Sequence, residues 1–527
     1  MKNETVNRSA PERKGSGKEY TKYVSLFSKV WNDQKPLAKL FRTSRSGYIY
    51  DTGTNKIMGC DDLVFDLLLN LYTANVESAV QTFLKNNGHD ALIHAADSIK
   101  QSIENQNILK FKKAEDFHFD PCKYSVDEMI NEHLELLVLE VTEKCNLRCA
   151  YCPYSDSYAH KRGHGTRDMT REVMKKALHY FKDHSIKQEK VYITAYGGEP
   201  GLCWSLIEWT THYAKELFKD KQLTFSVTTN GTSITPEMAR FLYENDFKTL
   251  VSIDGPAPIH DRFRKYKNGK GSYKDAIRGL KYLVDAYGDS AEKNVKLSMV
   301  YTPPFSGERL DEVAGLWMEN KWLPAKMRVN IVYPIPGSLS NEFYKQSAPE
   351  DKNIREWAVE KFREKYNRKG FSNPIADEIS GTILTKLINL PVYDVPRATV
   401  NFNGCCVPAA RRLFVTVDGE FRLCERIDSN APIIGNIDSG LDIDIIKTEY
   451  IDRYKAVSFP ECSVCWAARL CNSCFQDAFK DGVITASKRL SGCASIKKSR
   501  EKHLEYYCSL LEDDPTGLKR LLEEEVH

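Results

Sequence analysis

The segment Cys145-Asn-Leu-Arg-Cys149-Ala-Tyr-Cys152 places three cysteines close together in the chain. It follows residues 134–141, a short apolar run rich in Leu and Val, which is typical of a buried strand. Loops that leave the carboxyl ends of such strands carry the chemistry of α/β folds. Three thiolates suit a [4Fe–4S] cluster and leave its fourth iron without a protein ligand. The alternative is a zinc site, which usually needs a fourth ligand, and His160 is the nearest candidate.

The composition favours a multidomain protein without a membrane span. The 527 residues suffice for about two to four domains, and no run of about 18 apolar residues occurs. The net charge of +3 and the lack of a basic tract give no sign of nucleic-acid binding. Residues 1–18 are polar, so we expect a disordered tail rather than a secretory signal, and a cytoplasmic protein. In a reducing cytosol, 15 cysteines indicate metal ligands rather than disulfides.

The three-cysteine motif, with Tyr151 before its last cysteine, resembles the signature of the radical SAM enzymes. In that family the open iron chelates the amino and carboxylate groups of S-adenosylmethionine. The resemblance therefore implies that Cys145, Cys149 and Cys152 hold a [4Fe–4S] cluster and that Tyr151 lies in the cofactor site. It also implies that the reduced cluster splits the cofactor into methionine and a 5′-deoxyadenosyl radical.

Residues 133–337 are predicted to form the catalytic domain, because short apolar strands alternate there with amphipathic helices. Six βα repeats imply a parallel sheet and an α/β fold. This pattern matches the partial (β/α)6 barrel of the radical SAM enzymes. The predicted strands are residues 134–142, 191–195, 223–228, 249–253, 295–301 and 327–333.

Polar turns follow two of these strands. The turn after the second strand is Gly197-Gly198-Glu199-Pro200. Glycines let the backbone approach a ligand closely, so that exposed peptide groups can bond a charged amino group. In the radical SAM family this motif binds the amino group of the methionine moiety. After the third strand, Thr228-Thr-Asn230-Gly231 forms a polar turn suited to ribose hydroxyls.

The fourth predicted strand ends in Ser252-Ile-Asp254-Gly-Pro256, and His260-Asp-Arg262-Phe-Arg264 follows. Together the two segments resemble the peptide- and sulfatase-maturing branch of the superfamily. The resemblance makes Ser252, Asp254 and one of the arginines candidate cofactor residues. Arg264 is favoured over Arg262 as the partner of the methionine carboxylate. The alternative for the arginines is a surface ion pair.

Residues 19–110 are predicted to form a small separate domain, followed by a linker over residues 111–132. Residues 47–50 and 56–59 flank a turn-rich segment and indicate a β-hairpin, and three helical patterns follow, the first capped by Asp61 or Asp62. A hairpin with three short helices resembles a winged helix, the form of the RiPP recognition element that captures leader peptides. Physically, the leader peptide adds a strand to the exposed edge of the hairpin. The alternatives are a DNA-binding winged helix and a plain packing domain.

The cysteines return in the last third of the chain. Residues 338–395 are expected to be a helical bridging region that includes a charged stretch over residues 351–368, and residues 501–527 a C-terminal helical tail. Between them, residues 396–500 resemble the SPASM domain, whose seven-cysteine pattern holds two auxiliary [4Fe–4S] clusters. One interval is shorter than the family pattern by one residue. The cysteines are Cys405, Cys406, Cys424, Cys462, Cys465, Cys471, Cys474 and Cys493.

The ligation pattern of the SPASM family, carried over to this chain, implies two cluster sites. The first would have Cys424 and Cys474 with Cys405 or Cys406, but fully ligated relatives have a separate upstream cysteine. Here only Cys203 lies between the first motif and Cys405. The first auxiliary cluster is therefore expected to have an open iron, unless both adjacent cysteines bind it. A zinc ribbon is the alternative for the paired cysteines. The second site would be complete, with Cys462, Cys465, Cys471 and Cys493.

These resemblances predict a radical SAM peptide maturase with three [4Fe–4S] clusters and S-adenosylmethionine. The predicted reaction joins a cysteine sulfur to a carbon of a ribosomally made precursor peptide, and an auxiliary cluster takes up the released electron. The predicted partners are this peptide and an electron donor such as flavodoxin or ferredoxin, with no nucleic acid and no membrane. The alternatives are an anaerobic sulfatase maturase, a carbon–carbon crosslinking maturase and, outside the enzymes, an iron–sulfur redox sensor that binds DNA.

Overall fold

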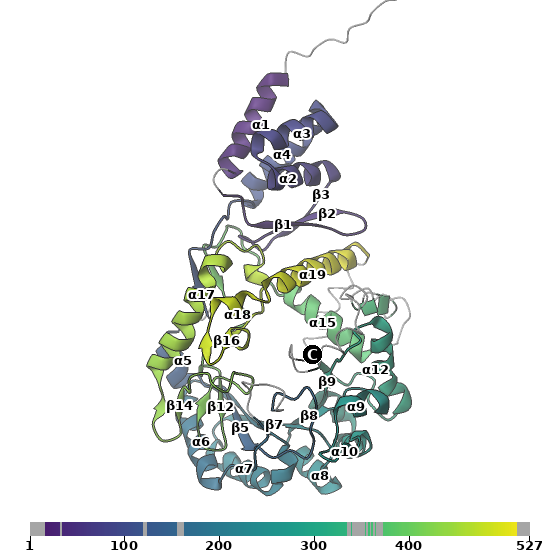
Figure 1. Ribbon diagram of the computed structural model, residues 1–527, viewed down its shortest axis with the longest axis vertical. Helices are drawn as coiled ribbons and strands as arrows, with labels where there is room; N and C mark the ends of the chain where they lie inside the picture. The colour runs from purple at the N-terminus through teal and green to yellow at the C-terminus, as the bar shows by residue number, and fades with distance from the viewer. Residues whose placement is uncertain are drawn as a thin grey trace, which may run out of the picture.

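The computed structural model describes residues 16–31, 34–119, 124–154, 163–334 and 373–513, together with residues 339, 354, 357, 358, 360, 361 and 364. Figure 1 shows the N-terminal helices at the top and the barrel at the bottom, with helix α19 (Cys493–Asp513) between them. His160 and most of the predicted bridging region before residue 373 lie outside the described residues. No described helix is long and apolar enough to cross a membrane.

The central sheet contains the six predicted parallel strands, which lie side by side in chain order. The predicted α/β class is therefore confirmed. Side chains between this sheet and the outer helices form the main hydrophobic core. The strands are β5 (Leu136–Thr142), β6 (Lys190–Gly197), β7 (Gln222–Thr229), β8 (Lys248–Ser252), β9 (Val295–Val300) and β10 (Val329–Val332). The helices and 3-10 turns among them are α6 (Arg171–His184), η1 (Pro200–Cys203), α7 (Trp204–Leu217), α8 (Pro236–Glu244), α9 (Ala257–Phe263), α10 (Tyr273–Tyr287), η2 (Gly288–Ser290), α11 (Ala291–Asn294) and α12 (Gly307–Glu319).

Two strands from the cysteine-rich region extend this sheet beyond β5. β12 (Arg412–Val415) pairs in parallel with β5, and β13 (Phe421–Arg422) pairs antiparallel with β12. Leu413, Phe414 and Val415 are fully buried there. The boundary predicted at residue 396 is therefore crossed by one sheet, because this apolar hairpin completes the barrel side of the core.

The N-terminal region folds around a core of its own. It contains the predicted hairpin and three helices, and Asp61 caps the first of them. Helix α1 begins at Ser16, inside the predicted tail, because Tyr23, Phe27 and Trp31 lie about one turn apart and pack into this core. The elements are α1 (Ser16–Trp31), β1 (Ala38–Arg42), β2 (Gly47–Asp51), β3 (Ile57–Cys60), α2 (Asp62–Thr73), α3 (Val76–Asn87) and α4 (His89–Gln106).

Two other predicted segments, the linker and the C-terminal tail, differ from the structure. The linker 111–132 contains β4 (Asp116–His118), which pairs with β11 (Thr399–Asn401), and helix α5 (Val126–Glu132). The predicted helical bridging region contains α15 (Pro374–Ile388), and most of its predicted charged stretch, residues 351–368, lies outside the described residues. The boundary at residue 500 cuts α19, which buries Leu504 and Cys508 and is packed rather than a tail. The remaining elements are β14 (Gly435–Asn436), β15 (Gly440–Leu441), α16 (Ile443–Ile445), the π-helical η3 (Ile446–Asp452), α17 (Arg453–Cys462), η4 (Ala468–Leu470), η5 (Phe475–Asp477), β16 (Phe479–Lys480), β17 (Val483–Ile484) and α18 (Ala486–Leu490).

The turn that joins β2 to β3 is buried against the cysteine-rich region. The Thr52 hydroxyl donates to the carbonyl oxygen of Trp466 at 2.8 Å. Arg469 Nε donates to the carbonyl oxygen of Thr52 at 2.7 Å. Trp466 and Arg469 belong to the segment between Cys465 and Cys471. The N-terminal domain therefore docks directly on a loop that carries two predicted cluster ligands.

Candidate functional site

The Gly-Gly turn holds the start of the first cysteine motif. The N–H of Gly198 donates to the carbonyl oxygen of Thr142 at 2.8 Å, and the N–H of Glu199 donates to that of Lys144 at 2.7 Å. A Cβ atom at Gly197 would collide with the Thr142 oxygen, and one at Gly198 with the Lys144 oxygen. Both glycines are thus required for the close approach of the two strand ends.

Glu199 joins the second strand end to the third. Its buried carboxylate accepts hydrogen bonds from the Thr229 hydroxyl at 2.6 Å, the Asn230 N–H at 2.6 Å and the Gly201 N–H at 2.9 Å. Asn230 Nδ2 donates in turn to Asn146 Oδ1 at 2.8 Å. Asn146 was not among the predicted site residues, although its place inside the cysteine motif was a usable signal. These contacts tie three strand ends into one unit.

The fourth strand end carries a buried ion pair. Asp254 accepts hydrogen bonds from the Tyr151 hydroxyl, from Arg264 Nε at 3.0 Å and from a backbone N–H of β9 at 3.0 Å. Arg264 is 7% exposed, and its guanidinium lies 5.5 Å from the centre of the Tyr151 ring. The surface ion pair considered for this arginine is therefore wrong, since the pair is internal. Arg262 instead donates to the carbonyl oxygen of Pro303 at 2.9 Å.

The other predicted cofactor residues lie at the same edge of the sheet. Ser252 ends β8, and Thr228 is the last residue but one of β7; both are half-buried. Pro200 begins η1 and is buried. Cys203 ends η1 beside Lys144, so it belongs to the barrel rather than to the later cysteines. The structure therefore brings all the predicted cofactor residues to the carboxyl ends of the strands.

Cys145, Cys149 and Cys152 share one site. Their thiols lie near enough to act electrostatically on one another, and they pack in one cluster with Tyr151 and Phe263. Burial raises the pKa of Cys145 and of Cys149 to about 12. These groups are therefore thiols unless a cation binds them. None of the described cysteines forms a disulfide.

The three thiols of the first motif can serve a cluster without converging on one point. Among the described residues, no three His, Cys, Asp or Glu side chains converge closely enough to hold one metal ion. The ligands of a cubane cluster bind separate irons, so its sulfurs need only surround a common space. His164, which the sequence did not single out, lies with Nε2 at 4.0 Å from Cys152 Sγ.

Four of the later cysteines line a cavity. Cys462, Cys465, Cys471 and Cys493 all line one cavity that is partly open to solvent. Burial raises the pKa of Cys462 to about 11, and the other three thiols also act on it. The family resemblance implied a complete cluster for these same four residues, and the cavity fits a group held by four thiolates.

The other four later cysteines gather beside β12 and β13. Cys474 lies near Cys424 and Cys406, and Cys405 lies near Cys474 and Cys406. The Cys405 thiol is buried and donates to the carbonyl oxygen of Ser473 at 3.8 Å, whereas Cys406 is exposed. The two adjacent cysteines therefore have different surroundings.

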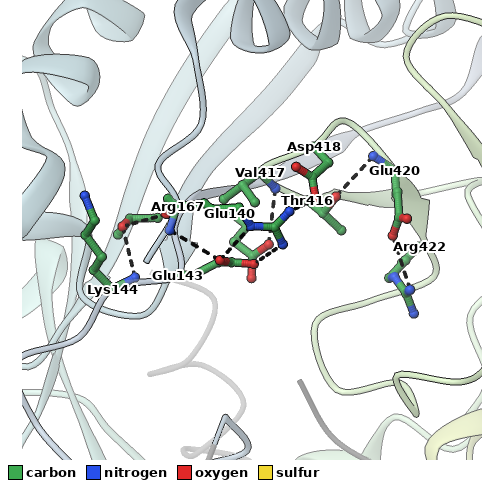
Figure 2. A network of polar contacts seen from close by, with 10 residues as sticks. Glu140, Glu143, Lys144, Arg167, Thr416, Val417, Asp418, Glu420 and Arg422 are labelled. Carbon is green, nitrogen blue, oxygen red and sulfur yellow. Dashed lines mark hydrogen bonds and ion pairs between the residues drawn. The ribbon is translucent and has the colours of Figure 1, made fainter. Parts of the chain in front are cut away.

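A polar network joins the first cysteine motif to this region (Figure 2). Arg167 donates to Glu143 at 3.0 Å from Nε and at 2.5 Å from Nη2, and to Asp418 at 2.5 Å from Nη1. Asp418 lies in the turn between β12 and β13. Lys144 pairs with Asp168 at 2.6 Å in the same network. The network therefore fixes the segment before the first cysteine to the hairpin beside Cys406 and Cys424.

His260 supports the strand end that carries the buried ion pair. Its Nε2 lies 3.0 Å from the Ser272 hydroxyl, which itself donates to the carbonyl oxygen of Arg264 at 2.8 Å. Nε2 therefore carries the proton, and Nδ1 accepts the N–H of Asp254 at 3.4 Å. Burial lowers the pKa of His260 from 6.5 to about 4.

We predict that this histidine makes folding sensitive to acid. The unfolded chain takes up a proton near pH 6.5, whereas folded His260 stays neutral down to about pH 4. The unfolded state therefore binds more protons in this window, and the free energy of unfolding rises with pH. The contribution is about 3 kcal/mol, complete above pH 6.5 and lost as pH falls to about 4. Urea unfolding of His260→Asn should show a shallower pH dependence than the parent, and the exposed His212→Asn serves as the control. Equal slopes in all three proteins would contradict the assignment.

Comparison with known proteins places the barrel in a family. Residues 139–316 match the model of the Radical SAM superfamily. The chain is 29% identical over 156 residues to the cysteine-type anaerobic sulfatase-maturating enzyme of Clostridium novyi, covering 28% of this chain and 40% of that protein. It is 32% identical over 186 residues to a mycofactocin maturase of Mycolicibacterium smegmatis, covering 34% and 41%. The chain spans about half or less of the length of the curated relatives it matches.

A solved structure shares the fold. Native anSMEcpe with bound AdoMet and Cp18Cys peptide superposes with a TM-score of 0.53, at 20% identity, over 72% of this chain and 98% of that one. The family match covers the strands whose ends surround the three-cysteine motif. Residues 139–316 of this chain therefore form a radical SAM domain.

Proposed function

We propose that this chain is a peptide maturase that forms thioether crosslinks in a ribosomally made precursor peptide. The observation that carries the proposal is the docking of a small sheet with an open edge onto the loop of Cys465 and Cys471. A peptide held at that edge lies on the same body as the radical SAM site and the later cysteines. Similarity to two maturases, and to a structure that contains AdoMet and a peptide, supports the proposal.

The residues of the barrel fit S-adenosylmethionine beside a cluster held by Cys145, Cys149 and Cys152. When bound, these groups supply a 5′-deoxyadenosyl radical that takes a hydrogen atom from a carbon of the peptide. Arg264 acts on the Cys149 thiol from its buried position and offers its guanidinium to the methionine carboxylate. The Glu199 carboxylate is already used by three donors of its own chain. The amino group is therefore left to the backbone of the Gly-Gly turn.

The proposed reaction balances without an added oxidant. S-adenosylmethionine, one peptide C–H and one peptide S–H become methionine, 5′-deoxyadenosine, a C–S bond and a proton. The electron that cleaves the sulfonium is released again when the sulfur bonds to the carbon radical and loses its proton. An external donor such as flavodoxin or ferredoxin supplies the first electron, and an auxiliary cluster receives the released one.

For the first auxiliary cluster we propose Cys406, Cys424 and Cys474 as ligands, with one iron left for the substrate thiol. The support is that Cys405 turns toward the Ser473 carbonyl whereas Cys406 is exposed near Cys474. Electron paramagnetic resonance should then show one auxiliary signal that changes when precursor peptide binds. A precursor with Ser in place of Cys should leave it unchanged. If no auxiliary signal responds to a modifiable peptide, the open-iron assignment fails.

The leader peptide is proposed to pair with β3. Within the described residues, β2 is the central strand of its sheet, and β1 and β3 are the edges. Helix α19 lies beside β1, where Lys39 pairs with Glu501 at 2.9 Å, so β3 is the more open edge. The Asp51 N–H donates to the carbonyl oxygen of Lys56 at 2.9 Å, which sets the alternation of the ladder. By that alternation, the N–H of Gly59 faces away from β2.

Gly59→Pro is therefore expected to weaken leader binding without unfolding the domain. Proline removes the outward N–H and crowds the edge, yet no bond to β2 is lost. Loss of one such bond and the crowding should lower leader affinity about tenfold. Gly59→Ala is the matched control, because its Cβ meets the Tyr48 ring only at ordinary contact distance. Isothermal titration with the full precursor measures the effect, and equal affinities for the two variants would exclude β3 as the pairing edge.

Product analysis separates this function from its rivals. The reconstituted enzyme is incubated with a synthetic candidate precursor peptide that contains Cys, and the product is alkylated and sequenced by mass spectrometry. A thioether removes two hydrogens and consumes a thiol. A carbon–carbon crosslink also removes two hydrogens but leaves every thiol alkylatable. Formation of an aldehyde at Cys or Ser instead would identify a formylglycine-forming enzyme, as the similarity to a sulfatase-maturating enzyme suggests.

A further inference from the structure

Arg489 lies against the second set of cysteines, which consists of Cys462, Cys465, Cys471 and Cys493. It belongs to α18 and is 3% exposed. Its Nη2 donates to Cys462 Sγ at 3.5 Å, and its Nη1 donates to Cys493 Sγ at 4.0 Å. Arg489 also lines the cavity that the four cysteines of this set surround. One guanidinium thus contacts two of the four sulfurs in the proposed second auxiliary site.

The other side of Arg489 faces the first set of cysteines, which consists of Cys405, Cys406, Cys424 and Cys474. Its guanidinium lies 5.0 Å from the centre of the Tyr454 ring, and Tyr454 is fully buried. The Tyr454 hydroxyl donates to the carbonyl oxygen of Ser473 at 3.3 Å, and the Cys405 thiol donates to the same oxygen at 3.8 Å. Arg489 and Tyr454 therefore fill the space between the two sets of cysteines.

The charge of Arg489 lacks a counter-ion among the described residues. No ion pair to a carboxylate is formed there, and Nε is buried without a hydrogen-bond acceptor. A buried cation without a partner is unfavourable, and a neutral thiol is only a weak acceptor. Four thiolates around a [4Fe–4S] core carry a net negative charge, which grows by one when the core is reduced. Such a group in the cavity would supply the missing partner.

The first set lacks this excess of positive charge. Arg412 lies near Cys424 and Cys406, but it forms an ion pair with Glu425, which also lies near Cys424. Arg426 is the other nearby cation; it also approaches Glu425, at 3.8 Å, and is half-exposed. Arg412 and Arg426 beside the first set are therefore neutralised or screened by water, and water also screens the exposed Lys497 beside the second set, whereas Arg489 is neither neutralised nor screened.

Resting on the proposed function, we propose that Arg489 raises the reduction potential of the second auxiliary cluster and makes it the site where the released electron comes to rest. A protein sets the reduction potential of such a cluster through its net charge and through hydrogen bonds to its sulfurs. A fixed positive charge and two N–H···S bonds stabilise the reduced core more than the oxidised one. Formation of the C–S bond releases one proton and one electron, and the oxidised core accepts that electron. Arg489 is a positioning residue in this scheme, since it touches neither substrate nor the cofactor.

The test is a redox titration of the full-length reconstituted protein, followed by electron paramagnetic resonance. Arg489→Met should lower the midpoint potential of one auxiliary signal and leave the other two clusters unchanged, at unaltered iron content. Arg489→Lys keeps the charge but cannot donate hydrogen bonds from two nitrogens to two sulfurs. It should therefore lower the midpoint potential of the same signal by a smaller amount. Arg426→Met is the control for removing a nearby but half-exposed arginine, and it should not move that signal.

The outcomes distinguish a failure of the proposed function from a failure of the role of Arg489. Zinc in place of iron, or fewer than three cluster signals in the parent protein, would overturn the proposed function itself, whatever the Arg489 variants show. Three clusters in the parent with an unshifted potential in Arg489→Met would overturn the role of Arg489 alone. If Arg489→Met fails to hold the cluster, Arg489→Lys decides: a downward shift of one signal supports the proposal, and an unshifted signal shows that Arg489 is only structural.

Discussion

Replacing Cys145, Cys149 and Cys152 together by Ala is expected to abolish cleavage of S-adenosylmethionine and to lower the iron content from about twelve to about eight atoms per chain. The three thiols lie in one buried site, so no other described cysteine can take over their role. The later sets lie in other elements and should keep their iron. Iron analysis of the anaerobically reconstituted protein and chromatography of 5′-deoxyadenosine measure the two effects.

The control for this variant is the pair Cys60→Ala and Cys203→Ala. Cys60 packs in the N-terminal domain, and Cys203 ends η1 beside Lys144. Neither is expected to bind iron, so both activity and iron content should survive. Stoichiometric zinc with little iron in the parent protein would contradict the cluster assignment for all three sites.

Which residues lie at the carboxyl edge of the barrel could be predicted, because the signals are local. Gly198, Asn230 and Asp254 each sit in a short motif directly after an apolar strand, and parallel strands bring such ends together. What these side chains contact could not be predicted. Glu199 and Asp254 were expected to face the cofactor, yet each carboxylate accepts three hydrogen bonds from its own chain. Apart from Gly201 and Arg264, those donors come from other strand ends, and nothing in one motif reveals them.

The contacts between the domains could not be predicted from the sequence either. β12 is only four residues long, and its partner β5 lies far back in the chain. Thr52 and Arg469 are more distant still, and neither belongs to a motif. Burial at such joints depends on surfaces that form only after each domain has folded. The sequence therefore predicted which residues lie at the strand ends but presented the N-terminal domain as separable.

Removing residues 1–110 is accordingly expected to destabilise the cysteine-rich region rather than only to abolish leader binding. A separable domain would leave cofactor cleavage intact after deletion. Here the buried turn between β2 and β3 supplies partners to the loop of Cys465 and Cys471. Its loss would expose that loop and leave buried polar groups unpaired. Loss of about four irons from the truncated protein, relative to the full chain, would confirm this dependence.

Arg469→Ala tests the same joint by a single change and should lower the free energy of unfolding by about 4 kcal/mol or more. Arg469 is 6% exposed, and besides Thr52 it donates from Nη2 to the carbonyl oxygens of Arg397 at 2.7 Å and Thr399 at 2.9 Å. Its removal leaves three carbonyl oxygens without their donor, and each such loss costs about 1–3 kcal/mol where water cannot enter.

The exposed Arg45 provides the matched control for this joint. It links the same domain to α19 through Asp513 at 2.6 Å, but its side chain is 57% exposed. An ion pair so open to water contributes about 1 kcal/mol or less, so Arg45→Ala should change the urea midpoint little. Comparing the loss of stability in the two variants distinguishes the effect of a buried contact from that of an exposed contact between the same domains. Equal and small effects would mean that the docked turn adds nothing to the stability of the cysteine loop. A large loss confined to Arg469→Ala, together with iron loss from the second set, would show that peptide capture and electron transfer share one structural joint.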